Sequence, residues 1–409
     1  MILYYRVILL GLASFDVAKT NIAKKYTYDV QMATAKRLEH FGETVFATWS
    51  RLATEYNAIN LGQGFPDFDA PDFVKEAAIK AIRDGENQYS RSAGHPLLVE
   101  AIADTFELPT NAMDEVTVTC GSTETIAAVI IGLVNPGDEV IVIEPFYDSY
   151  LACLSMAGAV PKIVTLHAPE FTLIEAELRE AFSDKTKMII VNSPHNPTGR
   201  VFNKSELELI AELSTKHDAI VLSDEVYNKL VLTGTHIPIA TLPGMKERTI
   251  TLRSLGKVFS VTGWKIGWSI APQKFTEAIR CAHQFMTFCP ATPLQVAAAT
   301  ALRAPESYFT EYTAQYTERR DLLVDGLRSV GFNVHSPQGT YFVLADHTPF
   351  GFSDDVSFCH HLVTSCGVVG IPPTAFYKQS TDGKGLVRFA FCKGVETLKN
   401  AVERLQGLC

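Results

Sequence analysis

Short apolar runs alternate with longer amphipathic stretches through the middle of the chain. The runs are rich in Val and Ile, and the stretches between them are long enough to form helices. Near-continuous apolar runs of this kind are typical of strands buried on both faces of a parallel or mixed sheet. The pattern therefore predicts an α/β fold. The predicted strands are 116–120, 140–143, 163–166, 188–191, 219–222 and 249–252.

The pattern changes in the last quarter of the chain. One long polar helix is predicted over 305–330, strands over 341–344 and 386–391, and helices over 355–366 and 396–405. Helices and strands without regular alternation indicate a smaller α+β domain. The predicted parts are an N-terminal extension or targeting segment (1–28), the first part of the small domain (29–70), a large domain (71–302) and the rest of the small domain (303–409).

Length, charge and cysteine content narrow the class of protein. A chain of 409 residues favours two domains over one core. A net charge of -9 argues against nucleic-acid and anionic-membrane partners. The eight cysteines form neither a CxxC pair nor a cluster with histidines, which argues against a metal site and a disulfide framework. Scattered thiols fit a reducing compartment.

The N-terminus has two interpretations. Residues 2–15 are mostly apolar but contain Arg6, and they are too few to span a bilayer. An extension is favoured over a targeting segment, because no charged region precedes the apolar run. The expected location is the cytoplasm, with the mitochondrion or plastid as the alternative.

Candidate chemistry follows the predicted strands. Open α/β sheets bind ligands just beyond the carboxyl ends of their strands. Gly121, Ser122 and Thr123 open a helix there, and free N–H groups at a helix N-terminus suit a phosphate. A plain helix cap is the alternative. Tyr147 follows the next strand and either stacks on a planar ring or packs in the core.

Two further strand ends carry polar groups. Two prolines and a glycine make 192–199 a rigid loop, which is either a mount for Asn196 or a simple turn. Asp224 follows the strand 219–222. A buried carboxylate there needs a cationic partner, such as a protonated ring nitrogen, whereas a surface aspartate needs none.

Lys257 completes the set of strand-end groups. It lies in a stretch with few acids and many apolar residues, although most single lysines are simply solvated. Desolvation lowers the pKa of a lysine and favours the neutral amine that forms a Schiff base. Together the strand ends offer a phosphate cradle, a stacking ring, an acid, polar donors and an amine. Pyridoxal phosphate requires this combination.

Seven longer stretches carry a family resemblance. They are NLGQGFPDF (60–68), NQYS (87–90), PGDEVIVIEPFYDSY (136–150), NSPHNPTG (192–199), SDEVY (223–227), SLGKVFSVTGWKIGW (254–268) and VRFAFCK (387–393). In this order they resemble class I aminotransferases of fold type I, and among them the kynurenine–oxoglutarate, glutamine and methionine aminotransferase group. The resemblance implies a mostly parallel seven-stranded sheet between helices, with pyridoxal phosphate held by the large domain.

The resemblance also implies roles around the cofactor. Lys257 forms the Schiff base and later moves the proton, and Asp224 pairs with the ring nitrogen. Asn196 and Tyr227 hydrogen-bond the ring oxygen, and Tyr147 stacks on the ring. Members of the family are dimers with shared sites. The residues expected at the phosphate are Ser122, Thr123, Ser254 and Lys265, with Tyr89 from the neighbouring subunit.

On the substrate side, Arg388 is expected to clamp the carboxylate, helped by Asn196 and the backbone near Gly64. Phe46 is expected to form an apolar wall, and Trp49 either a wall or part of the core. The implied activity is ping-pong transfer from kynurenine, glutamine, methionine or an aromatic amino acid to a 2-oxo acid. The alternative is a cysteine-conjugate β-lyase or an aminocyclopropane-carboxylate-forming lyase, and a non-catalytic binding protein is a third hypothesis.

Overall fold

The computed structural model describes residues 34–408, so the predicted segment 1–28 lies outside the described residues. Chain contacts divide the protein into two units, 1–39 and 40–409. The described part of the first unit holds one short 3-10 turn, η1 (Lys36–Leu38). Within 34–408, no helix is long and apolar enough to cross a membrane.

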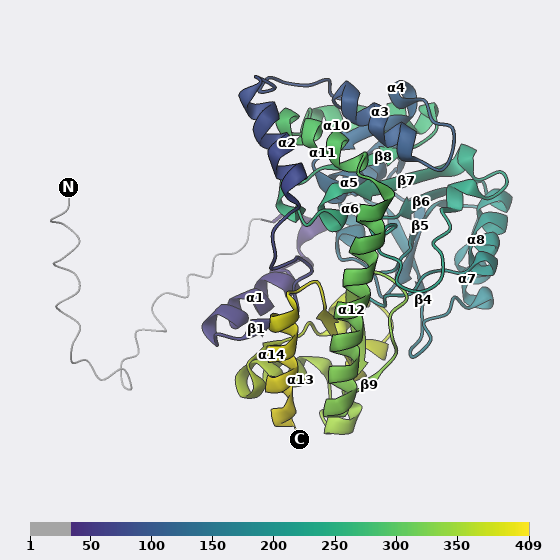
Figure 1. Cartoon of the computed structure of the whole chain (residues 1–409). Helices are drawn as coiled ribbons and strands as arrows, with labels where there is room; N and C mark the ends of the chain where they lie inside the picture. The colour runs from purple at the N-terminus through teal and green to yellow at the C-terminus, as the bar shows by residue number, and fades with distance from the viewer. Residues whose placement is uncertain (1–33, 409) are drawn as a thin grey trace, which may run out of the picture. The chain divides into compact units, whose positions relative to one another are not determined.

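A seven-stranded, mostly parallel sheet lies at the centre of the second unit (Figure 1). The order across the sheet is β2-β8-β7-β6-β5-β3-β4, and only β8 runs antiparallel to its neighbours. This confirms the predicted fold class, and each predicted strand of the large domain is present. The strands are β2 (Val116–Thr119), β3 (Glu139–Glu144), β4 (Val160–Thr165), β5 (Thr186–Asn192), β6 (Ile220–Asp224), β7 (Thr249–Ser254) and β8 (Gly267–Ile270).

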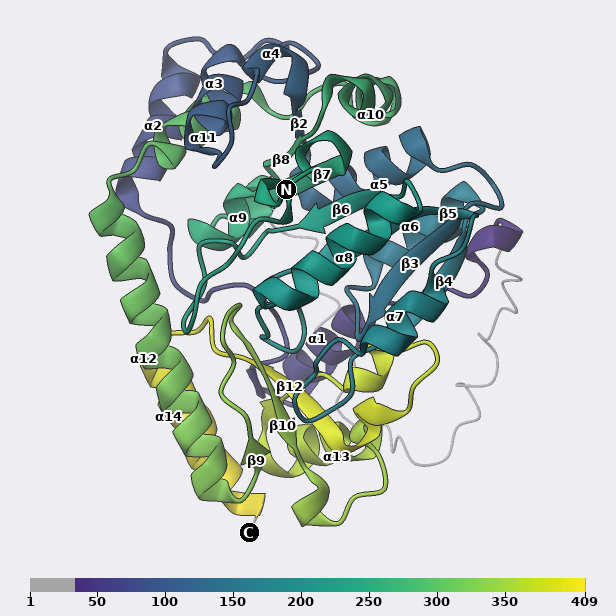
Figure 2. The same cartoon turned by 90° about the vertical axis from the view of Figure 1, so that its right-hand side faces the viewer.

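Helices cover both faces of this sheet. Ile141 and Ile189 pack into one core with α7 and α8, which lie in front of the sheet in Figure 2, whereas Val140 and Met188 pack into the other core. Alternate side chains of a strand point to opposite faces, so both faces require apolar cover. The helices of this region are α2 (Asp72–Arg83), α3 (Pro96–Thr105), α4 (Ala112–Glu115), α5 (Gly121–Leu133), α6 (Ser149–Ala157), α7 (Glu175–Ala181), α8 (Lys204–Lys216), α9 (Leu255–Val258), α10 (Gln273–Met286) and α11 (Thr292–Leu302).

The C-terminal part has an antiparallel sheet of order β12-β10-β9, formed by β9 (Asn333–Val334), β10 (Phe342–Asp346) and β12 (Leu386–Ala390). An N-terminal segment joins it, because β1 (Ile59–Asn60) pairs in parallel with β11 (Val368–Val369). The domain boundaries near residues 70 and 302 stay predictions. The helices of these parts are α1 (Val45–Glu55), α12 (Glu306–Val330), α13 (Asp355–His361) and α14 (Val395–Leu405).

Candidate active site

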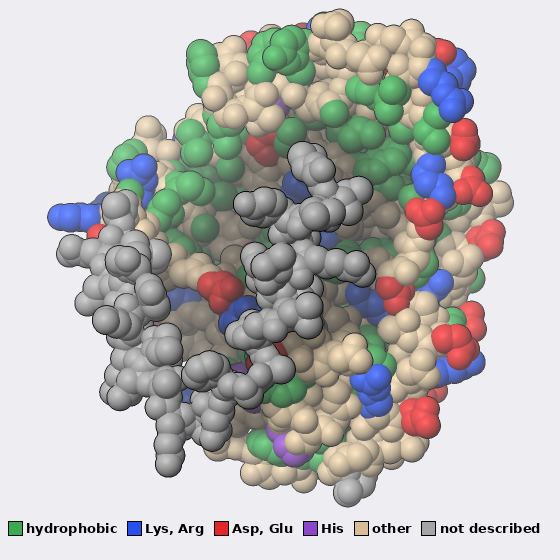
Figure 3. Space-filling model, turned by 90° about the vertical axis from the view of Figure 1, so that its left-hand side faces the viewer, with side chains coloured by type: hydrophobic (Ala, Val, Ile, Leu, Met, Phe, Trp, Pro, Cys, Tyr) green, Lys and Arg blue, Asp and Glu red, His purple; other side chains and the backbone are tan. Residues whose placement is uncertain are grey.

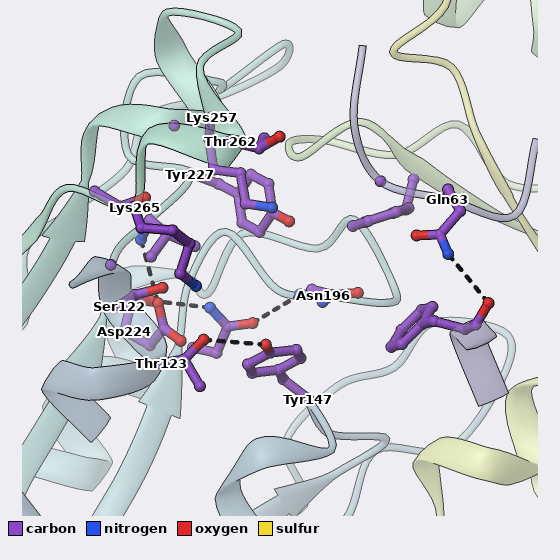
Figure 4. A pocket seen from close by; sticks show the side chains of 18 of the residues that line it. Gln63, Ser122, Thr123, Tyr147, Asn196, Asp224, Tyr227, Lys257, Thr262 and Lys265 are labelled. Atoms are coloured by element: carbon purple, nitrogen blue, oxygen red, sulfur yellow. Dashed lines mark hydrogen bonds between the residues drawn. The ribbon is translucent and has the colours of Figure 1, made fainter. Parts of the chain in front are cut away.

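A cavity of about 260 Å³ opens beyond the carboxyl ends of the parallel strands, where such sheets bind ligands (Figure 4). Most of the predicted site residues line it, and they come from segments far apart in the sequence. Those lining the cavity are Phe46, Gly64, Ser122, Thr123, Tyr147, Asn196, Asp224, Tyr227, Ser254, Lys257, Lys265 and Arg388.

One end of the cavity is built to hold an anion. Gly121 begins α5 at a φ of +77°, and β8 passes so close that a Cβ at Gly267 would lie 2.6 Å from Ser122 N. A Cβ at Gly121 would meet Lys265 Nζ at 3.1 Å. The free N–H groups of the helix N-terminus and the ammonium of Lys265 therefore converge on the same space, and both favour negative charge.

Lys257 lies on the short helix α9, where Tyr312 Oη donates a hydrogen bond of 3.0 Å to its carbonyl. Its Nζ is 5.8 Å from the centre of the Tyr227 ring and 5.7 Å from that of Tyr341. Burial lowers the pKa of this amine to about 8. A large share of the amine is therefore neutral and nucleophilic in mildly alkaline solution.

Asp224 ends β6 and is 3% exposed. Its carboxylate accepts hydrogen bonds from Tyr150 Oη at 2.6 Å and from the Val226 N–H at 3.3 Å. No lysine or arginine among residues 34–408 forms an ion pair with it. Burial raises the pKa of Asp224 to about 6. A buried carboxylate in this state would be stabilised by a cation at the cavity side.

Arg388, on β12, is the opposite case: a cation that is 1% exposed and forms no ion pair within the described residues. Its guanidinium donates to Asn196 Oδ1 at 3.1 Å and to the Gly62 carbonyl at 2.9 Å, and no described residue accepts a hydrogen bond from its Nε. The Phe342 ring lies 4.0 Å from the guanidinium carbon. Burial lowers the pKa of Arg388 to about 10, so it stays charged at neutral pH and is suited to bind a carboxylate.

Two aromatic residues surround the space between these charges. Tyr147 Oη lies 3.4 Å from Thr123 Oγ1, so its side chain reaches the start of α5. Burial raises the pKa of Tyr227 well above its usual value, and its hydroxyl stays protonated as a hydrogen-bond donor. The arrangement offers a donor and a flat aromatic surface to a planar ring.

Two of the predicted site residues lie elsewhere. Trp49 is 4% exposed, and its ring centre lies 5.0 Å from that of His360. It therefore belongs to the core and does not form a wall of the cavity. Tyr89 is 85% exposed, lies outside the cavity and contacts Phe288 at 5.3 Å. Its role toward a neighbouring subunit stays a prediction.

Sequence reasoning missed several residues of the site, among them Gln63, Thr262 and Phe342, which line the cavity, and Tyr150, which binds Asp224. Gln63 and Tyr150 both lie inside stretches that carry the family resemblance. Phe342 lies at the start of β10, and alternation along that strand gives its face but not its contact with Arg388.

Comparison with known proteins agrees with the geometry. The family model for aminotransferase class I and II matches residues 56–405. The chain is 42% identical to the kynurenine–oxoglutarate transaminase of Dictyostelium discoideum, over 95% of this chain and 98% of that protein. It is 36% identical to the methionine aminotransferase of Escherichia coli, over 91% and 97%. The solved N-succinyldiaminopimelate aminotransferase of Mycobacterium tuberculosis superimposes with a TM-score of 0.90 at 43% identity, covering 92% of this chain and all of that one.

Proposed function

The chain belongs to the class I and II aminotransferase family, and we propose that Lys257 carries its cofactor. The proposed amino donors are kynurenine, glutamine, methionine and aromatic amino acids. The family depends on pyridoxal phosphate. The observation that carries the proposal is that one cavity holds two buried charged groups that form no ion pair within residues 34–408, Asp224 and Arg388, together with the buried amine of Lys257.

The residues present fit this cofactor. The N-terminus of α5, Ser254 and Lys265 would hold the phosphate, and Asp224 would face the ring nitrogen, which supplies its missing cation. Asn196 and Tyr227 would bind the ring oxygen. When bound, pyridoxal phosphate withdraws electrons from the substrate Cα and carries the amino group between the two half-reactions.

The protein's own groups would then perform three tasks. Arg388 holds the carboxylate of the amino acid and of the 2-oxo acid in turn, and its planar fork matches a carboxylate with two hydrogen bonds. Asp224 would favour a protonated ring nitrogen when the cofactor is bound. Lys257 is the amine placed to take the proton from the substrate Cα and to deliver it to a carbon of the cofactor. A ping-pong sequence follows, because the same clamp serves both substrates.

The proposed assembly is a homodimer, which exposed apolar side chains support. Tyr89 and Phe285 are 85% and 87% exposed, and Met286 and Phe288 are each 44% exposed. Figure 3 shows hydrophobic side chains gathered over the upper half of one face. A second copy that covers Tyr89 would let this residue reach the partner's phosphate site. We place this dimer in the cytoplasm, which the scattered thiols favour.

A spectrophotometric screen of amino acids tests the activity. Each donor should change the absorbance of the bound cofactor, and a 2-oxo acid should restore it. Pyruvate and ammonia released without an acceptor would indicate the lyase instead.

Lys257→Ala should abolish turnover and leave the cofactor on the protein without a covalent bond. Lys229→Ala is the matched control, because Lys229 lies outside this cavity with its Nζ over the Phe309 ring. Mass spectrometry after borohydride reduction should find cofactor attached to the control and to the wild type. Attachment in Lys257→Ala would overturn the assignment of this lysine.

A further inference from the structure

The segment that carries Gln63 is held on both sides at the substrate end of the cavity. The Gly62 carbonyl accepts a hydrogen bond of 2.9 Å from Arg388, and the Gly64 carbonyl accepts one of 2.5 Å from Tyr341 Oη. Gln63 therefore starts from a fixed backbone next to the proposed carboxylate clamp. Groups that are held in this way lose little freedom when they bind a ligand.

The orientation of the Gln63 amide is determined by its partners. Its Nε2 donates to the Phe46 carbonyl at 3.1 Å and to Ser50 Oγ at 2.5 Å, both on α1. A carbonyl can only accept, so the nitrogen and not the oxygen must face α1. The oxygen Oε1 is turned toward the interior of the site (Figure 4). Within residues 34–408 it accepts no hydrogen bond from another residue.

The surroundings of this oxygen are largely aromatic. Phe46, Tyr147 and Phe342 line the same cavity, and the amide oxygen of Asn196 is already engaged by Arg388. Gln63 Oε1 thus offers a neutral acceptor beside apolar walls. An acceptor in such a place favours ligands that bring an N–H, because other ligands remove its water without replacing the hydrogen bond.

We propose that Gln63 determines donor specificity by accepting a hydrogen bond from an N–H on the substrate side chain. Amino acids with a primary amide or an aryl amine, such as glutamine and kynurenine, are then preferred over thioether and hydrocarbon side chains of similar size. The proposal rests on the aminotransferase function proposed above and selects among its donors. One neutral hydrogen bond of this kind corresponds to roughly threefold to tenfold in kcat/KM.

The test compares two pairs of donors, glutamine with methionine and kynurenine with phenylalanine. Gln63→Leu should lower kcat/KM for glutamine and kynurenine by roughly threefold to tenfold more than for methionine and phenylalanine. Ser50→Ala is the matched control: it removes one anchor of the Gln63 amide on α1 and leaves Oε1 in the cavity. Its donor preference should equal that of the wild type. An equal loss for all four donors in Gln63→Leu would overturn the proposal.

Binding without turnover gives a second readout, and its first comparison uses the wild type alone. Calorimetry on the cofactor-loaded wild type would compare two unreactive acids, the glutamine skeleton and the methionine skeleton, each without its amino group. The amide acid should bind more tightly to the wild type, and the difference should disappear in Gln63→Leu. Tighter or equal binding of the thioether acid by the wild type would also overturn the proposal. If the wild type processes none of the four donors, the aminotransferase function itself fails, which is a separate outcome.

Discussion

Asp224 and Glu225 are neighbours at the end of β6, and the structure surrounds their carboxylates in opposite ways. Both are buried, at 3% and 0% exposure. Arg253 donates to Glu225 through Nε at 3.1 Å and a terminal nitrogen at 2.8 Å, and Ser223 Oγ donates at 2.9 Å. Within residues 34–408, the Asp224 carboxylate accepts hydrogen bonds only from the hydroxyl of Tyr150 and one backbone N–H.

The difference appears in the pKa values. Burial raises the pKa of Asp224 to about 6, whereas for Glu225 the effect of burial is outweighed by Arg253 and His236, which lower its pKa to about 2. The backbone stays extended just past β6, where the Glu225 N–H donates to the Leu252 carbonyl, and consecutive residues of extended backbone point to opposite sides. Asp224 therefore lines the cavity, whereas Glu225 is fully buried outside it. A carboxylate whose charge is compensated within the chain is structural, and one left uncompensated at a cavity is a candidate for ligand binding.

The largest effect on stability is expected behind the site. Glu225→Gln should lower the free energy of unfolding by about 3–5 kcal/mol, because it leaves Arg253 buried without its main partner. Glu107→Gln is the control: Glu107 pairs with the same guanidinium at 2.7 Å but is 37% exposed, and its loss should cost about 1 kcal/mol or less. Urea unfolding of the cofactor-free proteins measures both. Equal costs would show that the two carboxylates share the charge of Arg253.

The pH dependence of this pair has a definite sign. The folded-state pKa of Glu225 lies below its usual value of 4.5, so its contribution is present above that pH and is lost as pH falls toward about 2. Acid should therefore destabilise the wild type more than Glu225→Gln in this window.

For Asp224, on the cavity side, the pH dependence of stability has the opposite sign. The folded-state pKa of Asp224 is raised from 3.8 to about 6, so the cofactor-free protein loses stability as pH rises through this range. Asp224→Asn should remove that loss and stabilise the cofactor-free protein by roughly 3 kcal/mol near pH 8. Unfolding measured across this pH range checks the slope. A variant that is less stable than the wild type, with the slope retained, would contradict the uncompensated charge.

The same substitution should reverse its effect when the cofactor is present. Pyridoxal phosphate should stabilise the wild type more than Asp224→Asn, because only the aspartate gains a partner for its charge. The variant should also lose turnover.

The contrast between these neighbours also shows which features can be predicted from the sequence. Apolar runs located the strands, and the rule for open sheets directed attention to Asp224 and Lys257, because both features depend on local patterns. The apolar pattern does not predict strand β8, because Gly267 and Ser269 interrupt its apolar residues, although Ser269 is fully buried. Gly267 is small because the start of α5 passes closely: a Cβ there would lie 2.6 Å from Ser122 N.

The remaining gaps are long-range contacts. Alternation at the end of β6 predicts that Asp224 and the following Glu225 point to opposite sides, but only the three-dimensional structure brings Arg253 to one of them. Likewise, the Phe46 carbonyl that orients the Gln63 amide lies on a separate helix. Arg388 was reached through the family resemblance, since no local pattern separates it from other arginines.

The smallest expected effect comes from Tyr150, which binds the cavity-side carboxylate. Its hydroxyl is placed to donate to Asp224 Oδ2, and this hydrogen bond holds the pKa of Asp224 lower than burial alone would. Tyr150→Phe should cost about 1 kcal/mol and move the Asp224 transition to higher pH by somewhat less than one unit. The pH dependence of unfolding of the cofactor-free variant measures the shift.

Tyr312→Phe separates the loss of a buried hydroxyl from the effect on Asp224. Tyr312 is similarly buried, but its hydroxyl binds the Lys257 carbonyl, so this variant should cost similar stability without moving the Asp224 transition. The direction of the shift in Tyr150→Phe also identifies the donor. A shift to lower pH would mean that a protonated Asp224 donates to Tyr150, because losing that bond would favour the charged carboxylate. In that case the cavity would present a neutral acid, and the contrast with Glu225 would be one of protonation rather than of an uncompensated charge.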